Sequence, residues 1–79
     1  MQKPTPKTEC AIRVVDKIMA IFITPHTNDA REFINNECGV FGELTMDNRG
    51  KFTLFVDDGY DCHEVAEWIR SNFDTEDSV

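Results

Sequence analysis

The sequence of 79 residues contains no long hydrophobic run, and its first nine residues contain no apolar stretch. Its longest apolar stretch, IMAIFI, has six residues, far fewer than the ~18 that a membrane-spanning helix needs. The opening MQKPTPKTE has two prolines and two lysines but no apolar segment of the kind found in a signal peptide. We therefore expect a cytoplasmic protein that does not enter a membrane.

Motifs that carry chemistry are also missing. The three cysteines, Cys10, Cys38 and Cys62, show no CxxC spacing, and the two histidines form no HxxxH pair of the kind that binds zinc. The four glycines form no phosphate-binding loop, and neither a nucleophile–base signature nor an EF-hand order of carboxylates is present. The sequence therefore predicts no catalytic residue, no metal and no cofactor, and we expect that the protein is not an enzyme.

The segment FVDDGYDCHEVAEWI, residues 55–69, is the place where a reactive site would be expected. Cys62 falls in the first turn of a predicted helix, where backbone N–H groups favour a thiolate, and His63 is its neighbour. Adjacent helical side chains point ~100° apart, however, and Asp58 and Asp61 oppose a further negative charge nearby. A packing role for Cys62 is favoured, and a thiol or metal protein using Cys62 and His63 is the third hypothesis for function.

Basic residues are scarce in the last third of the chain. Residues 57–79 hold eight carboxylates and a single base, Arg70, so this segment has a net charge of −7, equal to that of the whole chain. Such a surface repels phosphate backbones and attracts basic proteins. We therefore expect no direct binding of nucleic acid, and we expect a protein partner, in particular one with a basic surface.

Composition divides the chain into three parts. Residues 1–9 have no apolar period and are predicted to form a flexible N-terminal arm. Residues 10–73 are predicted to form a single α+β domain, and residues 74–79 a short acidic C-terminal tail.

Three segments of the domain have strand character. Residues 10–24, CAIRVVDKIMAIFIT, are predicted to form one strand in which Asp16 and Lys17 mark a bulge or a break. Residues 40–46 and 51–56 alternate in polarity on either side of the turn formers DNRG, which predicts a β-hairpin.

Two segments have helical periodicity. The first follows the candidate N-cap Thr27 and ends near Gly39, a residue suited to the left-handed position after a helix. The second follows Asp61, which forms a capping-box arrangement with Glu64. Its apolar stripe begins at Cys62, so this cysteine is predicted to lie in the core.

The resulting element order, β-α-β-β-α, predicts an α+β fold. We expect a three-stranded antiparallel sheet, with the last strand in the middle and both helices on one face. This is the ferredoxin-like plan lacking its last strand.

Two helices can cover only one face of such a sheet. Residues 18–23 are apolar at every position, so one alternating triplet must point away from the helices, either Ile18, Ala20 and Phe22 or Met19, Ile21 and Ile23. Soluble monomers seldom leave an apolar patch of this kind bare, so we expect a second copy of the chain, forming a homodimer, or another protein to cover it. The alternative is that the N-terminal arm of the same chain folds over it. The remaining residues predicted on this partner-binding face are Phe41, Glu43, Thr45, Thr53 and Phe55.

A second candidate surface lies on the last helix, where aromatic side chains at the edge of the core stand beside acids. Aromatic residues in such positions are common in protein interfaces. The residues predicted to bind a partner here are Tyr60, Glu64, Glu67 and Trp68.

Together these features favour a small acidic binding module without catalytic activity, acting as a regulator, adaptor or inhibitor of another protein. The alternative is a nucleic-acid mimic, in which the acidic third of the chain occupies the basic cleft of a nucleic-acid-binding protein. Defence inhibitors encoded by viruses or mobile elements would be examples of that class.

Overall fold

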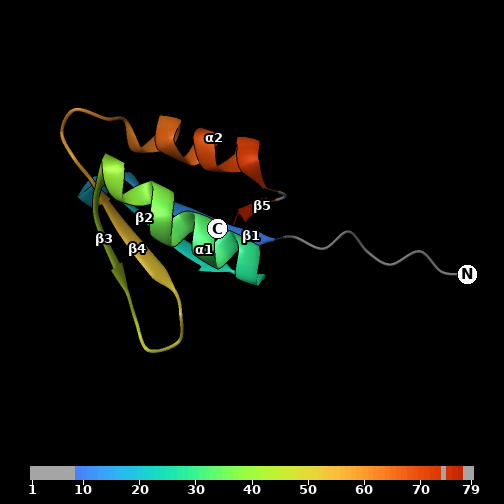
Figure 1. The fold of residues 1–79 in the computed structure, drawn as a ribbon. Coiled ribbons are helices and arrows are strands. Elements are labelled where there is room, and N and C mark those ends of the chain that lie inside the picture. The colour runs from blue at the N-terminus through green and yellow to red at the C-terminus, as the bar shows by residue number, and fades with distance from the viewer. Residues whose placement is uncertain (1–8, 74, 78–79) are drawn as a thin grey trace, which may run out of the picture.

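The computed structural model describes residues 9–73 and 75–77 and shows an α+β fold (Figure 1). One sheet has the strand order β3-β4-β2-β1-β5. The pairs β3–β4, β4–β2 and β2–β1 are antiparallel. The short edge strand β5 is parallel to β1. The strands are β1 (Cys10–Val15), β2 (Ala20–Pro25), β3 (Gly42–Met46), β4 (Phe52–Val56) and β5 (Thr75–Asp77). The helices are α1 (Asn28–Glu37) and α2 (Cys62–Asn72), with the short 3₁₀ segments η1 (Asp16–Ile18) and η2 (Cys38–Phe41).

The prediction of one strand over residues 10–24 is wrong, because the chain reverses in the middle of that segment. Asp16–Ile18 form a 3₁₀ turn, and Met19 has a left-handed conformation with φ of 54°. Val15 then pairs with Ala20, so the two halves form a hairpin. A straight strand of fifteen residues would extend ~50 Å, far beyond any strand available to pair with it. The sheet is therefore larger than the predicted three strands, and the ferredoxin-like plan does not hold in that detail.

The predicted C-terminal tail contains one element of the sheet. Thr75–Asp77 form β5, which pairs with Cys10–Ile12 of β1. Residues 1–8 of the predicted arm and residues 74, 78 and 79 of the predicted tail lie outside the described residues.

The hairpin of β3 and β4 is confirmed, and β4 lies between β3 and β2 as expected. Its turn is held by the Asp47 carboxylate, which accepts hydrogen bonds from the backbone N–H groups of Arg49 at 2.8 Å and Lys51 at 3.0 Å. Gly50 has a positive φ of 82°, a conformation that glycine adopts without a steric penalty. Local turn chemistry thus closes this hairpin.

Thr27 and Asp61 are confirmed as the N-cap residues, whereas the capping-box bond between Glu64 and the Asp61 backbone is not formed. The Thr27 hydroxyl accepts a hydrogen bond from the Ala30 N–H at 3.1 Å, and the Asp61 carboxylate accepts one from the His63 N–H at 2.8 Å. Gly39, however, is not left-handed, because η2 continues the helical path beyond α1 instead of ending it.

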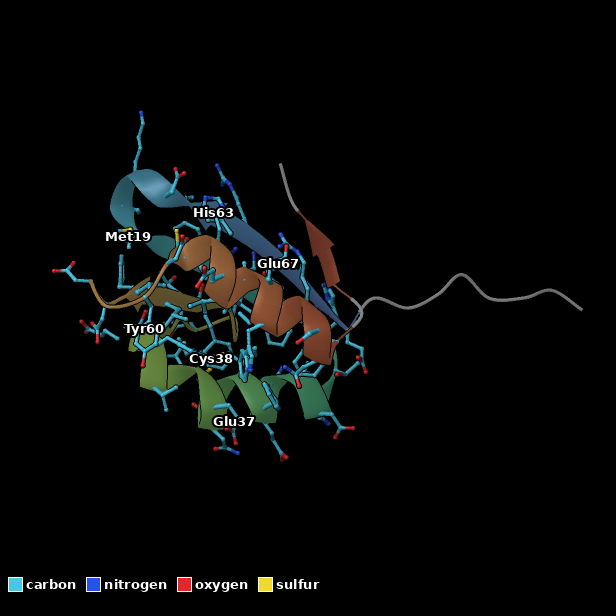
Figure 2. All side chains as sticks on the ribbon, turned by 90° about the horizontal axis from the view of Figure 1, so that it is seen from above. Met19, Glu37, Cys38, Tyr60, His63 and Glu67 are labelled. Atoms are coloured by element: carbon cyan, nitrogen blue, oxygen red, sulfur yellow. The ribbon has the colours of Figure 1, made fainter. Side chains whose placement is uncertain are left out.

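Strand register places both helices on the same face of the sheet. Ile21 pairs with Leu54 and Ile23 with Phe52, and these side chains belong to the buried core. Ile34 of α1 packs into the same cluster, as do side chains of α2, namely Cys62, Val65, Ala66 and Ile69. Each large aliphatic or aromatic side chain buried here contributes about 1.5–3 kcal/mol, so this one-sided core stabilises the fold. Figures 1 and 2 show α1 and α2 side by side over the strands.

Neither helix within residues 9–73 and 75–77 combines the length and the apolar character needed to cross a membrane.

The close approach of β3 to β4 at Gly42 predicts a large difference between two glycine substitutions. A Cβ at Gly42 would collide with the Phe55 carbonyl oxygen and lie 2.9 Å from the Asp57 nitrogen, so Gly42→Ala should destabilise the fold by about 1–3 kcal/mol. A Cβ at Gly39 meets nothing within 4 Å, so Gly39→Ala should leave the stability unchanged or raise it slightly. Urea denaturation of both variants measures the difference, and equal unfolding midpoints would contradict this account of the β3–β4 contact.

Candidate functional site

The sheet face turned away from the helices has an apolar centre and a polar margin. The strand register aligns side chains of this face in rows that cross the strands from β3 to β1. One row consists of Glu43, Phe55, Ala20 and Val15. The next row runs Thr45, Thr53, Phe22 and Arg13. We call this surface the open face, defined by Ala11, Arg13, Val15, Ala20, Phe22, Thr24, Glu43, Thr45, Thr53 and Phe55.

Two phenylalanines stand out on the open face. Phe22 is 37% exposed and Phe55 is 42% exposed, whereas Ala20, which pairs with Phe55 in the register, is fully buried. Thr53 pairs with Phe22 and is half-buried. The two rings therefore border an apolar area on neighbouring strands.

The structure settles which side of β2 meets the helices. Ile21 and Ile23 are fully buried in the core, and Met19 packs against the same cluster, so Ala20 and Phe22 face outward. Ile18 belongs to the turn between β1 and β2. Four of the predicted interface residues lie together on the open face as expected, namely Glu43, Thr45, Thr53 and Phe55.

The predicted position of Phe41 on the open face is wrong. Phe41 belongs to η2, and its ring packs edge-to-face on Tyr60, with a centroid distance of 5.1 Å, and against Trp68, also at 5.1 Å. The reason is that β3 begins at Gly42, so the alternation of a strand does not extend back to Phe41. The Asp57 N–H donates to the Phe41 carbonyl at 2.8 Å and holds this segment beside the loop that leads to α2.

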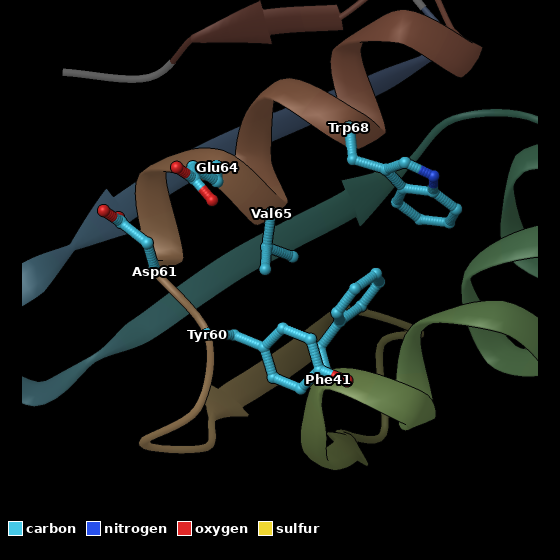
Figure 3. A pocket seen from close by; sticks show the side chains of 6 residues that line it. All are labelled: Phe41, Tyr60, Asp61, Glu64, Val65 and Trp68. Carbon is cyan, nitrogen blue, oxygen red and sulfur yellow. The ribbon is translucent and has the colours of Figure 1, made fainter.

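Phe41 completes a pocket with residues from the start of α2. Figure 3 shows three rings, those of Phe41, Tyr60 and Trp68, with Val65 between them and the two carboxylates at the other side. We call this the aromatic–acidic pocket, defined by Phe41, Tyr60, Asp61, Glu64, Val65 and Trp68. Its volume of about 180 Å³ is below the ~300–1,000 Å³ of typical small-molecule sites, so it suits the end of one side chain.

The spacing within α2 explains how the pocket is assembled. Counted from Asp61, Glu64 lies three positions farther along the chain, Val65 four and Trp68 seven. This spacing places the four side chains along one side of a helix. Trp68 also contacts Phe33 of α1, at a centroid distance of 5.4 Å, so its ring is braced from the far side. The pocket wall is therefore built from packed elements.

Glu67, predicted in the same surface, lies outside the pocket. Its carboxylate accepts a hydrogen bond from Arg70 at 2.8 Å on the exposed side of α2. Tyr60, Glu64 and Trp68 thus line one pocket as expected, together with Phe41. Glu67 is not part of this pocket, and Figure 2 shows it away from Tyr60, farther along α2.

All three cysteine thiols lie in surroundings that raise their pKa and so disfavour the thiolate form. Burial raises the pKa of the Cys10 thiol to about 11 and that of Cys38 to about 12. Cys62 is only 2% exposed, and burial, followed by the charges of Asp61 and Asp16, raises its pKa as well. Cys62 packs in the core, as predicted.

The neighbouring histidine serves a different contact. His63 Nε2 lies 3.1 Å from the Asp16 carboxylate on the exposed surface, and this hydrogen bond holds the pKa of Asp16 below its usual range. Among the described residues, no three His, Cys, Asp or Glu side chains gather in a way that could hold a metal ion. The histidine and the buried Cys62 thiol thus occupy different environments.

Sequence reasoning missed several residues of both surfaces. The sequence alone does not indicate Arg13 and Val15, because a single strand over residues 10–24 has no reversal that brings them beside Phe22 and Ala20. It gives Phe22 only as a member of one of two alternative triplets. Helical spacing alone is enough to add Asp61 and Val65 to the second surface.

No protein-family model, curated protein or solved structure matches this chain.

The buried thiols predict slow modification of the native protein. At pH 8 the thiolate fraction of a cysteine with a pKa of about 11 is roughly 100-fold below that of an ordinary thiol, and burial limits access further. Native protein should therefore react with Ellman's reagent far more slowly than protein unfolded in guanidinium, where all three cysteines react. One fast-reacting thiol in the native protein, absent from a Cys62→Ser variant, would instead support a thiol site at Cys62.

Proposed function

We propose that this chain is a small, acidic, non-enzymatic protein-binding module that docks its partner on the open face. The observation that supports this most directly is the pair of exposed rings, Phe22 and Phe55, on neighbouring strands of a sheet face that neither α1 nor α2 covers. In this proposal the module acts as a regulator, adaptor or inhibitor in the cytoplasm.

The energetics favour an occupied face. Burial of apolar surface contributes about 25 cal/mol per Å², so covering two half-exposed phenylalanines against a complementary surface is favourable. The surrounding threonines and charges form the polar margin that protein interfaces normally have. The threonines of this margin have short, β-branched side chains, which lose little conformational freedom when a partner docks.

The charge pattern of the open face suits a second copy of the chain as partner. Glu43 lies at one end of its row on β3, and Arg13 lies at the opposite end of the next row on β1. If two sheets pack face to face about a two-fold axis parallel to the strands, the β3 edge of one copy lies over the β1 edge of the other. Glu43 of each copy then approaches Arg13 of the other, so a homodimer is the first arrangement to test.

Self-association provides the first test. Phe22→Thr combined with Phe55→Thr removes both rings while keeping residues that suit strands. We expect sedimentation of the wild-type chain to show a dimer that weakens by at least about tenfold in the double variant, since two interface rings are lost. Met46→Thr, which removes a 57% exposed side chain from the opposite face of the same sheet, should leave the dimer intact.

A foreign partner provides the second test. A wild-type chain that stays monomeric at all accessible concentrations would exclude the homodimer. A protein captured from the native host by the wild-type chain and by Met46→Thr, but not by the double variant, would then identify the partner. Capture that is equal for all three chains would overturn the proposal.

The second candidate function is the nucleic-acid mimic. It is supported by the exposed carboxylates on the loop before α2 and on its first turns, namely Asp57, Asp58, Asp61, Glu64 and Glu67. Binding of this kind should weaken steeply with added salt, because it depends on screened charges, and Glu64→Lys with Glu67→Lys should abolish it. An affinity that does not change with salt would exclude the mimic, whichever partner is found.

A further inference from the structure

We propose that the aromatic–acidic pocket binds the cationic end of an arginine or lysine side chain from a partner protein. The pocket is a separate site from the open face, since it lies on the helix-bearing side of the molecule between η2 and α2. The proposal therefore does not depend on the sheet-docking function.

The composition of the pocket matches a cation. The faces of Phe41, Tyr60 and Trp68 carry the negative part of an aromatic quadrupole, which attracts an ammonium or guanidinium group within about 6 Å. Asp61 and Glu64 add two carboxylates at the other side, and the part of the chain that the structure describes contributes no basic residue to the lining. A neutral aliphatic side chain would gain nothing from those carboxylates, and an anion would be repelled by them.

The pocket is also well organised before any ligand arrives. Edge-to-face packing fixes Phe41 against Tyr60, with an interplanar angle of 86°, and against Trp68, with an angle of 63°. Asp61 is held as the N-cap of α2 by its hydrogen bond from the His63 N–H. Binding therefore orders few side chains, which keeps its entropic cost low.

The charged groups around the pocket determine whether it favours a positively or a negatively charged ligand. The N-terminus of α2 carries a partial positive charge that by itself would disfavour a cation. Asp61 and Glu64 offset it, and Asp57 and Asp58 on the preceding loop are exposed acids that extend the negative field. The net field thus favours a basic side chain, in keeping with the charge of −7 on residues 57–79.

The size of the pocket limits the ligand to a side-chain end. A volume of about 180 Å³ accommodates a guanidinium or a methylated ammonium group with part of its alkyl stem but excludes larger cofactors. Tyr60, at 44% exposure, leaves the mouth open to a side chain projecting from another protein.

The sole tryptophan and the sole tyrosine both line this pocket, which makes binding directly measurable. The probes are N-acetyl-arginine methylamide, N-acetyl-lysine methylamide and its trimethylated form, titrated at constant ionic strength. N-acetyl-citrulline methylamide and N-acetyl-norleucine methylamide are the neutral controls of similar shape. We expect the cations to change Trp68 fluorescence and to shift its indole N–H resonance in a saturable way with millimolar affinity, and the neutral compounds to have no saturable effect.

Three variants locate the interaction. Glu64→Gln should weaken cation binding at least about threefold, and Asp61→Asn should do the same while keeping an oxygen that can cap α2. Phe41→Leu, which keeps an apolar contact but removes the ring, should weaken it similarly. Glu32→Gln removes the same charge from the exposed side of α1, away from both surfaces, and should leave binding unchanged.

The outcomes separate clearly. Saturable binding of any of the cations that depends on Glu64 and Phe41 supports the site, and the tightest probe tells which basic side chain it prefers. Citrulline binding as strongly as arginine, an unchanged Trp68 signal, or equal binding by Glu64→Gln and the wild-type chain would overturn it. Such a failure leaves the open face untouched, because Phe22 and Phe55 are not part of this pocket.

Discussion

The reversal of the chain between β1 and β2 is the constraint on which the rest of the structure depends. One turn at Asp16–Ile18, followed by a left-handed Met19, folds the most apolar segment of the chain back on itself. This makes β2 a central strand, paired on both sides, and its register with β4 sends Ile21 and Ile23 into the core. The same register places Phe22 on the opposite face. The pairing of β2 with β4 therefore determines both which residues form the core and which residues lie on the open face.

The consequence is that, among the described residues, helices cover one face of the sheet only. Both helices pack on the face formed by the core residues, and together they leave the second face of a wide sheet uncovered. In a chain this short a single core contributes only modest net stability, so contact with a partner can add a substantial fraction of the total. The exposed rings of Phe22 and Phe55 lie on this second face, and the proposed docking rests on them.

The helix-bearing side offers different chemistry. There the aromatic residues are braced by one another and by α1, and carboxylates stand beside them at the start of α2. The molecule therefore has two chemically unlike surfaces, an apolar one on the open face and an aromatic–acidic one on the helix-bearing side. A partner that covers the first leaves the second accessible, and the physical driving forces, burial and cation attraction, respond differently to salt.

The sequence alone determined the features that depend on neighbouring residues. Thr27 and Asp61 cap their helices, Asp47 and Gly50 close a hairpin, and Cys62 begins a buried stripe, because each of these follows from short-range hydrogen bonding or periodicity. The tertiary structure alone decided where β1 turns into β2, which face Phe22 takes and which neighbours Phe41 meets. Residues 18–23 are apolar on both sides, so no local pattern distinguishes inward from outward, and only pairing with β4 does. Phe41 likewise lies one residue before a strand, where a shift of one position changes the side on which a ring falls.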